Sequence, residues 1–295
     1  MTTRPRACVA LGSLLIICAA VLTHAQAQPR GIYTSVLDKE GNPVEGLTPA
    51  DFVVREDNVS REVLRVEPAA APMQIALLVD NSSRSGANIR DIRDAAAEFI
   101  RAVTGTGMKN EVAVIAVADR PTLLVDYTTD QAKLLKGAAL FTQPQSGAYM
   151  LDGIIETSRA MKKREAARPV IVAIATNGPE LSNRYHDQVL RALKDADVSL
   201  HIVMVGQPPT DITTNEGRER ATSFSDGTEQ TGGRYDNVLA PSALGARLKQ
   251  VGTELTHQYL VTYAHPQSLI PPEKIRITSK RADLIVRGQP AKVSK

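Results

Sequence analysis

Cysteine is scarce in this sequence, which has only Cys8 and Cys18 among its 295 residues. Both lie within the first 27 residues, a segment that we expect to be removed during export. The chain after Ala27 therefore cannot form a disulfide or a cysteine metal site, even in an oxidising compartment. Its stability has to come from a hydrophobic core, for which its length is ample.

A strong excess of charge of one sign is also missing. The chain carries 35 basic and 32 acidic side chains, and its formal net charge is +3 at pH 7. This balance gives no reason to expect a nucleic acid or an anionic membrane surface as a partner. After residue 27, no segment is long and apolar enough to suggest a membrane span.

Motifs for catalysis are absent as well. The chain has no Gly-x-Ser-x-Gly elbow, no Gly-rich loop ending in Gly-Lys-Ser/Thr and no His-Glu-x-x-His. His201 lies in an apolar, strand-like run and is expected in the core, while the other histidines lack the spacing of metal ligands. We therefore expect no enzymatic activity and no organic cofactor.

The N-terminal segment has the pattern of a cleavable export signal. Arg4 and Arg6 precede an uncharged and mostly apolar stretch over residues 7–22. Ala25-Gln26-Ala27 then gives the small-x-small pattern that signal peptidases recognise. We predict a signal peptide over residues 1–27 that is cleaved after Ala27, with Ala25 as the second choice.

Two other types of N-terminal segment fit less well. The apolar stretch is shorter than the roughly 20 residues that span a membrane, which argues against an anchor. Ile17 is bulky where a lipoprotein signal has a small residue before its cysteine, so Cys18 is not expected to be lipidated. The predicted location is therefore secreted or periplasmic.

The middle of the chain alternates strand-like and helix-like patterns. Runs that are apolar on both faces, which are typical of strands in mostly parallel sheets, occupy residues 75–79, 112–117, 170–174 and 202–205. Amphipathic helical patterns that begin at Ile89, Leu151, Val189 and Leu244 lie among them. Residues 118–120 are too few for a crossover helix, so an antiparallel hairpin is expected there. The predicted fold class is α/β, a doubly wound, mostly parallel sheet with one antiparallel edge strand.

The two ends of the chain after the signal read as β-structure. Extended segments separated by turn formers occupy residues 31–67, and apolar alternation returns over 273–287. Neither end has enough strands to be stable alone, so we expect them to pack together as one β module. A disordered tail after about residue 272 is the alternative. The predicted domains are an N-terminal β segment at 28–70, an α/β domain at 71–265 and a C-terminal β segment at 266–295.

Several loops resemble those of von Willebrand factor A (VWFA) domains. Asp80-Asn81-Ser82-Ser83-Arg84-Ser85 follows a predicted strand and resembles the family's Asp-x-Ser-x-Ser motif. Gly147-Ala148-Tyr149-Met150-Leu151-Asp152 and Ala175-Thr176-Asn177-Gly178 resemble two further loops of the family. Residues 38–57 and 258–263 are similar to segments of exported bacterial proteins called VWFA-related. The resemblance implies a VWFA-like fold and the recognition of a partner.

In metal-binding VWFA domains, a divalent ion is held above the sheet by oxygen ligands, with one position left for a partner's carboxylate. Asp80 and Ser82 match two of these ligands. Arg84, Ala148 and Asn177 stand where the family has its second Ser, its Thr and its second Asp, and each change weakens a metal site. The resemblance therefore implies a vestigial site, with binding of Mg²⁺ or Mn²⁺ as the alternative.

The loops at the carboxyl ends of the predicted strands should converge on one edge of the sheet, the usual ligand face of such folds. These loops cover residues 80–87, 144–149, 176–183 and 206–216. The residues expected to contact a partner there are Arg84, Ser85, Tyr149, Asn177 and Glu180. The predicted function is recognition of an unidentified protein. The alternatives are a metal-dependent adhesion module and an envelope scaffold that does not use this edge.

Overall fold

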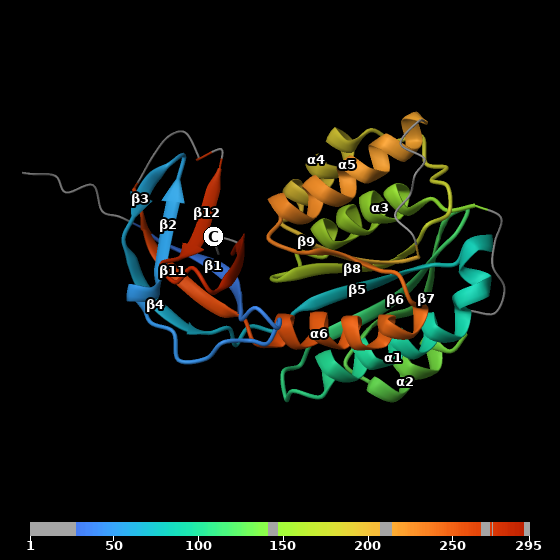
Figure 1. The fold of residues 1–295 in the computed structure, drawn as a ribbon, viewed down its shortest axis with the longest axis horizontal. Coiled ribbons are helices and arrows are strands. Elements are labelled where there is room, and N and C mark those ends of the chain that lie inside the picture. Colours follow the sequence, from blue (N-terminus) through green and yellow to red (C-terminus); the bar gives the residue numbers. More distant parts are fainter. Residues whose placement is uncertain (1–27, 141–146, 207–213, 267–271, 273, 292–295) are drawn as a thin grey trace, which may run out of the picture.

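A computed structural model describes residues 28–140, 147–206, 214–266, 272 and 274–291 of the chain. The predicted signal peptide, with both expected cleavage positions, lies outside the described residues. In the described part, a helix-covered sheet and a smaller β module lie side by side (Figure 1). No helix within these residues combines the length and the apolar character that a membrane crossing requires.

Six strands form the central sheet, in the order β10-β9-β8-β5-β6-β7. Their bounds are β5 Gln74–Asp80, β6 Glu111–Val117, β7 Pro121–Thr128, β8 Pro169–Thr176, β9 Ser199–Val205 and β10 Tyr235–Val238. The four strands predicted from apolar runs are almost wholly buried, because helices cover both faces of the sheet. β5 pairs in parallel with β6 and β8, whereas β7 is antiparallel to β6. The predicted mostly parallel sheet with one antiparallel edge is confirmed.

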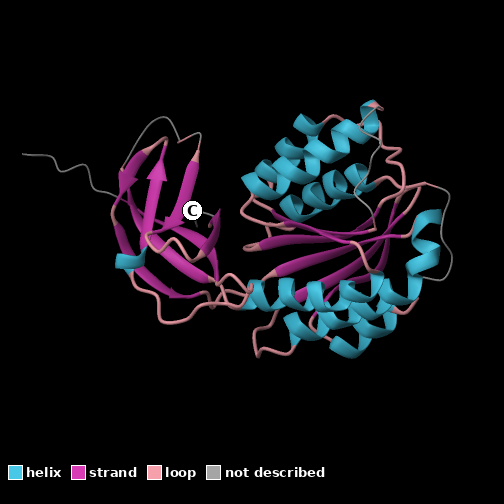
Figure 2. Ribbon diagram, viewed as in Figure 1, coloured by secondary structure: helices cyan, strands magenta, loops and turns pink. Residues whose placement is uncertain are grey.

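Helices form a layer on each face of this sheet. One layer contains α1, α2 and α6, and the other contains α3, α4 and α5 (Figures 1 and 2). Their bounds are α1 Ile89–Thr104, α2 Gln131–Ala138, α3 Met150–Lys163, α4 His186–Asp195, α5 Asn215–Gln230 and α6 Leu244–Thr256. Phe99 and Leu248 pack in one core, while Leu151 and Phe224 pack in the other. The sequence patterns do not predict α2, α5 or β10.

Both ends of the described chain build the β module. Its strands are β1 Gln28–Leu37, β2 Phe52–Glu56, β3 Val59–Arg61, β4 Val63–Pro68, β11 Tyr259–His265, β12 Ile275–Ser279 and β13 Ile285–Pro290. They form a four-stranded sheet, β13-β1-β11-β4, and a three-stranded sheet, β12-β2-β3. β1 pairs with β13 and β2 pairs with β12, so the N- and C-terminal segments fold together. Ile32, Phe52, Val261 and Ile277 join both sheets in one hydrophobic core.

The boundary between the two parts differs from the expected one at residue 265. Strand β11 pairs with β1 and β4, and it therefore belongs to the β module. The chain leaves the α/β domain at the end of α6, one strand earlier than expected. The reason is that an apolar strand pattern does not specify which sheet the strand will join.

A buried arginine holds the two parts together at the amino end of β8. Arg168 is 2 % exposed and donates hydrogen bonds to the carbonyl oxygens of Ala71 (2.9 Å) and Leu255 (3.2 Å) and to Oε1 of Gln258. Its guanidinium carbon lies 4.5 Å from the centre of the Tyr33 ring in β1. Burial lowers the pKa of Arg168 to about 10, which still leaves it charged at neutral pH.

A second buried contact between the two parts centres on Glu254 of α6. Its carboxylate accepts hydrogen bonds from Arg234, which precedes β10, and from Arg287 of β13, each at 3.0 Å. Burial alone would raise the pKa of Glu254, but Arg287, His201 and Arg234 together outweigh it, so this pKa lies below its usual value. The β module is therefore fixed to the α/β domain by charge-assisted hydrogen bonds as well as by packing.

Candidate functional site

The candidate site lies where β5 and β8 end. These strands are parallel neighbours, so the loops after them meet at the same edge of the sheet. We call residues 80–87, 147–149 and 176–185 the rim. The backbone N–H of Leu181 donates to the carbonyl oxygen of Ala148 at 2.8 Å, which joins two of its three segments. The expected segments at 144–146 and 207–213 lie outside the described residues.

Asp80 links the first and third segments of the rim. It is 2 % exposed, and one carboxylate oxygen accepts the backbone N–H of Ser82 at 2.8 Å. The other oxygen accepts both the backbone N–H and the hydroxyl of Thr176, at 2.9 and 2.5 Å. Asp80 therefore has protein donors on both oxygens and acts as a cap that ties the two loops together.

A second anchor comes from α5, which the sequence patterns do not predict. Arg220 is 4 % exposed, and its guanidinium donates to the carbonyl oxygens of Gly178 (2.5 Å) and Thr176 (3.0 Å). Its guanidinium carbon also lies 5.4 Å from the centre of the Phe224 ring, one helical turn further along α5. A permanent positive charge is thus fixed beneath the third segment of the rim.

Several features of this edge weigh against the binding of a divalent ion there. The Asp80 carboxylate already accepts three hydrogen bonds, and Ala148 offers no side-chain oxygen. Arg84 and Arg220 place two positive charges near the same edge, where they would repel a dication. Among the described residues, no group of three or more His, Cys, Asp or Glu side chains could hold a metal ion.

The five residues predicted to contact a partner divide into two groups. Arg84 and Asn177 are exposed and Tyr149 is half-buried, so all three reach the surface of the rim. Ser85 is fully buried because the short helical turn over Ser83–Asn88 points its hydroxyl inward, where it donates to the carbonyl oxygen of Ser82 at 2.8 Å. Glu180 is only 4 % exposed. In this conformation, Ser85 and Glu180 support the rim from below and cannot be reached by a partner.

Glu180 is an incompletely satisfied acid beneath the rim. One carboxyl oxygen accepts the backbone N–H of Ser182 at 3.2 Å, and the other has no hydrogen-bond partner in the described structure. Burial raises the pKa of Glu180 to about 7, against the opposing influence of Ser182 and Arg220. This carboxyl therefore changes charge near neutral pH.

Two apolar side chains on the rim were missed by the sequence reasoning. Leu181 is 46 % exposed and Tyr185 is 60 % exposed, so both present apolar area at the surface of the rim. Tyr149 lies in the adjoining segment. No periodic pattern marks residues 181–185, so the sequence gives no signal that separates them from an ordinary solvated loop.

Two polar clusters away from the rim consist of buried side chains that hydrogen-bond to one another. The Ser199 hydroxyl lies 3.0 Å from Nε2 of His201, but both side chains are buried within β9. Burial lowers the pKa of His201 to about 4, in agreement with the prediction of a core histidine. In the β module, buried Glu56 accepts the Tyr263 hydroxyl at 2.7 Å and lies 2.7 Å from Nδ1 of His265.

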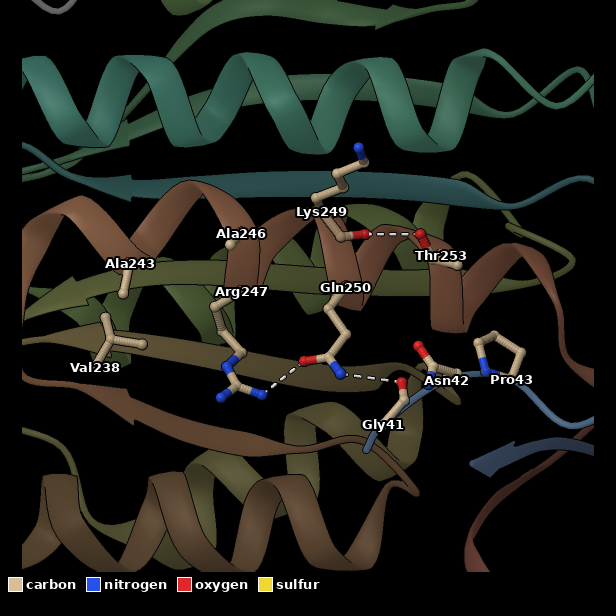
Figure 3. Close-up of a pocket in the computed structure, with 10 residues that line it drawn as sticks. All are labelled: Gly41, Asn42, Pro43, Val238, Ala243, Ala246, Arg247, Lys249, Gln250 and Thr253. Carbon is tan, nitrogen blue, oxygen red and sulfur yellow. Dashed lines mark hydrogen bonds between the residues drawn. The ribbon is translucent and has the colours of Figure 1, made fainter. Parts of the chain in front are cut away.

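A cavity of about 480 Å³ lies between α6 and the turn near Gly41 (Figure 3). Gln250 crosses it, with its amide nitrogen donating to the carbonyl oxygen of Gly41 at 3.0 Å. The amide oxygen of Gln250 accepts from Arg247 at 2.6 Å. The central polar group of this cavity is thus used to hold the turn against α6.

Comparison with known proteins agrees with the fold of the helix-covered sheet. Residues 75–179, which contain all of the rim except its last six residues, match the family model of the von Willebrand factor type A domain. A solved von Willebrand factor type A structure from Catenulispora acidiphila matches with a TM-score of 0.50 and 10 % identity, over 91 % of this chain and 72 % of that one. Comparison with curated proteins finds no match.

A pilus adhesin, SpaC from Lactobacillus rhamnosus GG in its open conformation, is also similar in structure. Its TM-score is 0.50 at 10 % identity, over 88 % of this chain and 44 % of the adhesin. At such low identity the likeness concerns the fold alone. Together with the family match, it shows that the helix-covered sheet has the fold of a von Willebrand factor type A domain.

Proposed function

We propose that this chain is an exported protein-recognition module that contacts its partner through the rim without a bridging metal ion. The observation that carries the proposal is Arg220, a buried cation bonded to two rim carbonyls at the edge where related domains hold a metal. With Arg220 and Asp80 holding the loops, the rim needs no ion to keep its shape.

The surface of the rim has the composition of a protein contact. Arg84 is exposed and forms no ion pair with any described residue, so its guanidinium is available for a partner's carboxylate. Tyr149, Leu181 and Tyr185 add aromatic and aliphatic area beside it. Arginine and tyrosine are the side chains that most often anchor interfaces. The similarity to a pilus adhesin fits such a role.

A binding role also agrees better with the chemistry of the described residues than a catalytic one. The Ser199–His201 contact is closed to solvent, and so is the hydroxyl–carboxylate contact between Thr176 and Asp80 in the rim, because all four side chains are buried. A metal-dependent adhesion module and a scaffold that binds through the β module remain the rival functions, and one experiment separates all three.

The experiment places a photo-cross-linking amino acid at Asn177 on the rim, in the mature protein within its own host cells. A matched probe replaces Arg55, an exposed residue of β2 in the β module. We expect a discrete adduct from position 177, formed equally with Mg²⁺ and with EDTA, and lost when Arg84→Glu is added. Position 55 should give no such adduct.

The rival functions predict other results. An adduct from position 177 that disappears with EDTA would identify metal-dependent adhesion. An adduct from position 55 alone would identify a scaffold that binds through the β module. Either result would contradict the proposed function.

A further inference from the structure

A groove runs between α3 and α4. Both helices cover the face of the sheet opposite α1 and α6 (Figure 1). The volume of the groove is about 250 Å³. Each helix contributes side chains spaced three or four residues apart, which places them on one helical face. The facing residues are Ile155, Arg159 and Lys162 from α3, and Gln188, Arg191, Ala192 and Asp195 from α4.

The lining of this groove is strongly basic. Arg159, Lys162, Arg184 and Arg191 contribute positive charges, and Asp195 is the one acidic residue that lines it. The whole chain, by contrast, has 35 basic and 32 acidic side chains. Positive charge is therefore concentrated at the groove, whereas the chain as a whole is nearly balanced in charge.

Ion pairs occupy the ends of the groove and leave its middle open. Lys162 pairs with Asp195 across one end at 3.5 Å, and Arg184 pairs with Asp152 at the other end at 2.6 Å. Arg191 is 3.3 Å from Asp187 on its own helix and remains 72 % exposed. Arg159 is exposed and forms no ion pair with any described residue.

We infer that this groove binds an acidic segment of a partner protein, with Arg159 and Arg191 as its central contacts. The inference rests on the proposed function, because the ligand is part of the protein that the rim recognises. Arg184 belongs both to the rim and to the groove, so one partner can cover the two surfaces without a break. A planar guanidinium takes a carboxylate through two parallel hydrogen bonds.

Two features favour separate carboxylates over a phosphate backbone. Ile155 and Ala192 give the groove an apolar floor, against which the methylene groups of acidic side chains can pack. Asp152 and Asp195 flank the groove at its two ends, where they would repel a continuous polyanion. A short peptide with acidic side chains can place its charges between them.

The test measures binding of a short fluorescein-labelled peptide, in which glutamates alternate with neutral residues, to the mature full-length protein by fluorescence anisotropy at low salt. Arg159→Glu should weaken binding about tenfold, because an attractive contact becomes repulsive, whereas Arg159→Lys should retain most of it. Arg90→Glu is the matched control. It makes the same charge change on exposed α1, on the opposite face of the sheet, and should leave binding unchanged.

Three results would overturn the inference. One is equal binding by the wild type and Arg159→Glu, provided that both melt at the same temperature. Another is tighter binding of inorganic polyphosphate than of the peptide, which would point to a different class of ligand. The third is loss of peptide binding on Arg84→Glu alone, which would place the acidic contact on the rim and leave the proposed function standing.

If instead the groove binds the peptide but position 177 gives no cross-link, the proposed rim function fails and the groove remains.

Discussion

A buried arginine lies at each end of the central sheet, but one stabilises a loop and the other connects two parts of the chain. Arg220 at the rim donates to Thr176 and Gly178, two carbonyls of one loop. Arg168 at the opposite end donates to Ala71 and Leu255, which lie where the chain enters and leaves the α/β domain. One arginine therefore shapes a loop within a domain, and the other fixes two parts of the chain to each other.

The buried glutamates at the two ends differ in a related way. Glu254 has two arginines within hydrogen-bonding distance, and together with His201 they outweigh burial and lower its pKa. Glu180 interacts with a single arginine whose hydrogen bonds go elsewhere, so burial prevails and raises its pKa to about 7. The number of cations that face a buried acid, rather than burial alone, decides its charge at neutral pH.

The largest effect is expected from removing the β module's last strands. A chain that ends at Pro271 lacks β12 and β13, which pair with β2 and β1. Residues 28–67 should then lose their protection from protease, because each sheet loses a strand and the core loses Ile277. The α/β domain should stay protected. Unchanged cleavage within 28–67 would mean that the N-terminal segment folds without the C-terminal one.

The next largest effect is expected at Arg168. Arg168→Ala should lower the free energy of unfolding by about 4 kcal/mol, because two buried acceptors and one partly buried acceptor lose their donor. Urea denaturation measures this change. The control is Arg101→Ala, whose exposed pair with Glu98 should contribute less than about 0.5 kcal/mol. Similar losses in the two variants would contradict the role of Arg168 as a buried connector.

A smaller effect, with a defined dependence on pH, is expected at Glu180. Because its pKa rises from 4.5 to about 7 on folding, the native state is favoured below pH 4.5 and loses this advantage as the pH rises to about 7. Glutamine does not ionise, so Glu180→Gln should not lose stability over this pH range. The variant should be more stable than the wild type by about 3 kcal/mol near pH 8, with little difference near pH 4. Stability curves from urea denaturation at several pH values measure it.

Glu254→Gln provides the opposite case. Its pKa is lowered on folding, so its contribution is present above its unfolded pKa of 4.5 and is lost as the pH falls. This variant should be less stable than the wild type at neutral pH. If both glutamine variants moved stability in the same direction near pH 8, the contrast between the two ends would be wrong.

The smallest expected effect is that of divalent ions. Calorimetry with Mg²⁺, Mn²⁺ and Ca²⁺ should show no tight binding, and Tm should not rise, because Arg220 and Asp80 already hold the rim. An ion that bound the native state at a hundred times its Kd would stabilise it by about 2.7 kcal/mol. Low-micromolar binding that is lost on Asp80→Ala would contradict a metal-independent rim.

Much of the sheet could be predicted because its strands are buried on both faces. Val112–Val117 and Val170–Ile174 are continuous apolar runs rich in β-branched residues, a pattern typical of strands that are covered on both faces. Strand β10 has the sequence Tyr-Asp-Asn-Val and no such run. Helix α5 buries Arg220 and Ser223 on its inner face, so its polar residues hide the helical period.

The candidate site could be predicted in part only, because the sequence of a loop does not specify which of its side chains are buried. Asp80, Arg84 and Asn177 lie in the loops after β5 and β8, and they share one edge because the ends of these parallel strands meet there. Whether a loop residue points outward depends on local turns, and for this reason Ser85 and Glu180 are buried against expectation. Arg220 comes from a helix more than forty residues after Thr176 and Gly178. The local sequence offers only Phe224, four residues further on, as a hint that this arginine is buried.

Strand β1 has a consequence for the order in which the chain can fold. Its neighbours in the sheet are β11 and β13, and its first residue pairs with His265 near the other end of the chain. Contacts over such sequence distances carry a high loop-closure entropy and form late. The parallel sheet between them needs no residue of β1, so it can collapse first and bring the two distant segments together. Strand β1, the first described strand in sequence order, is therefore expected to be among the last to pair during folding.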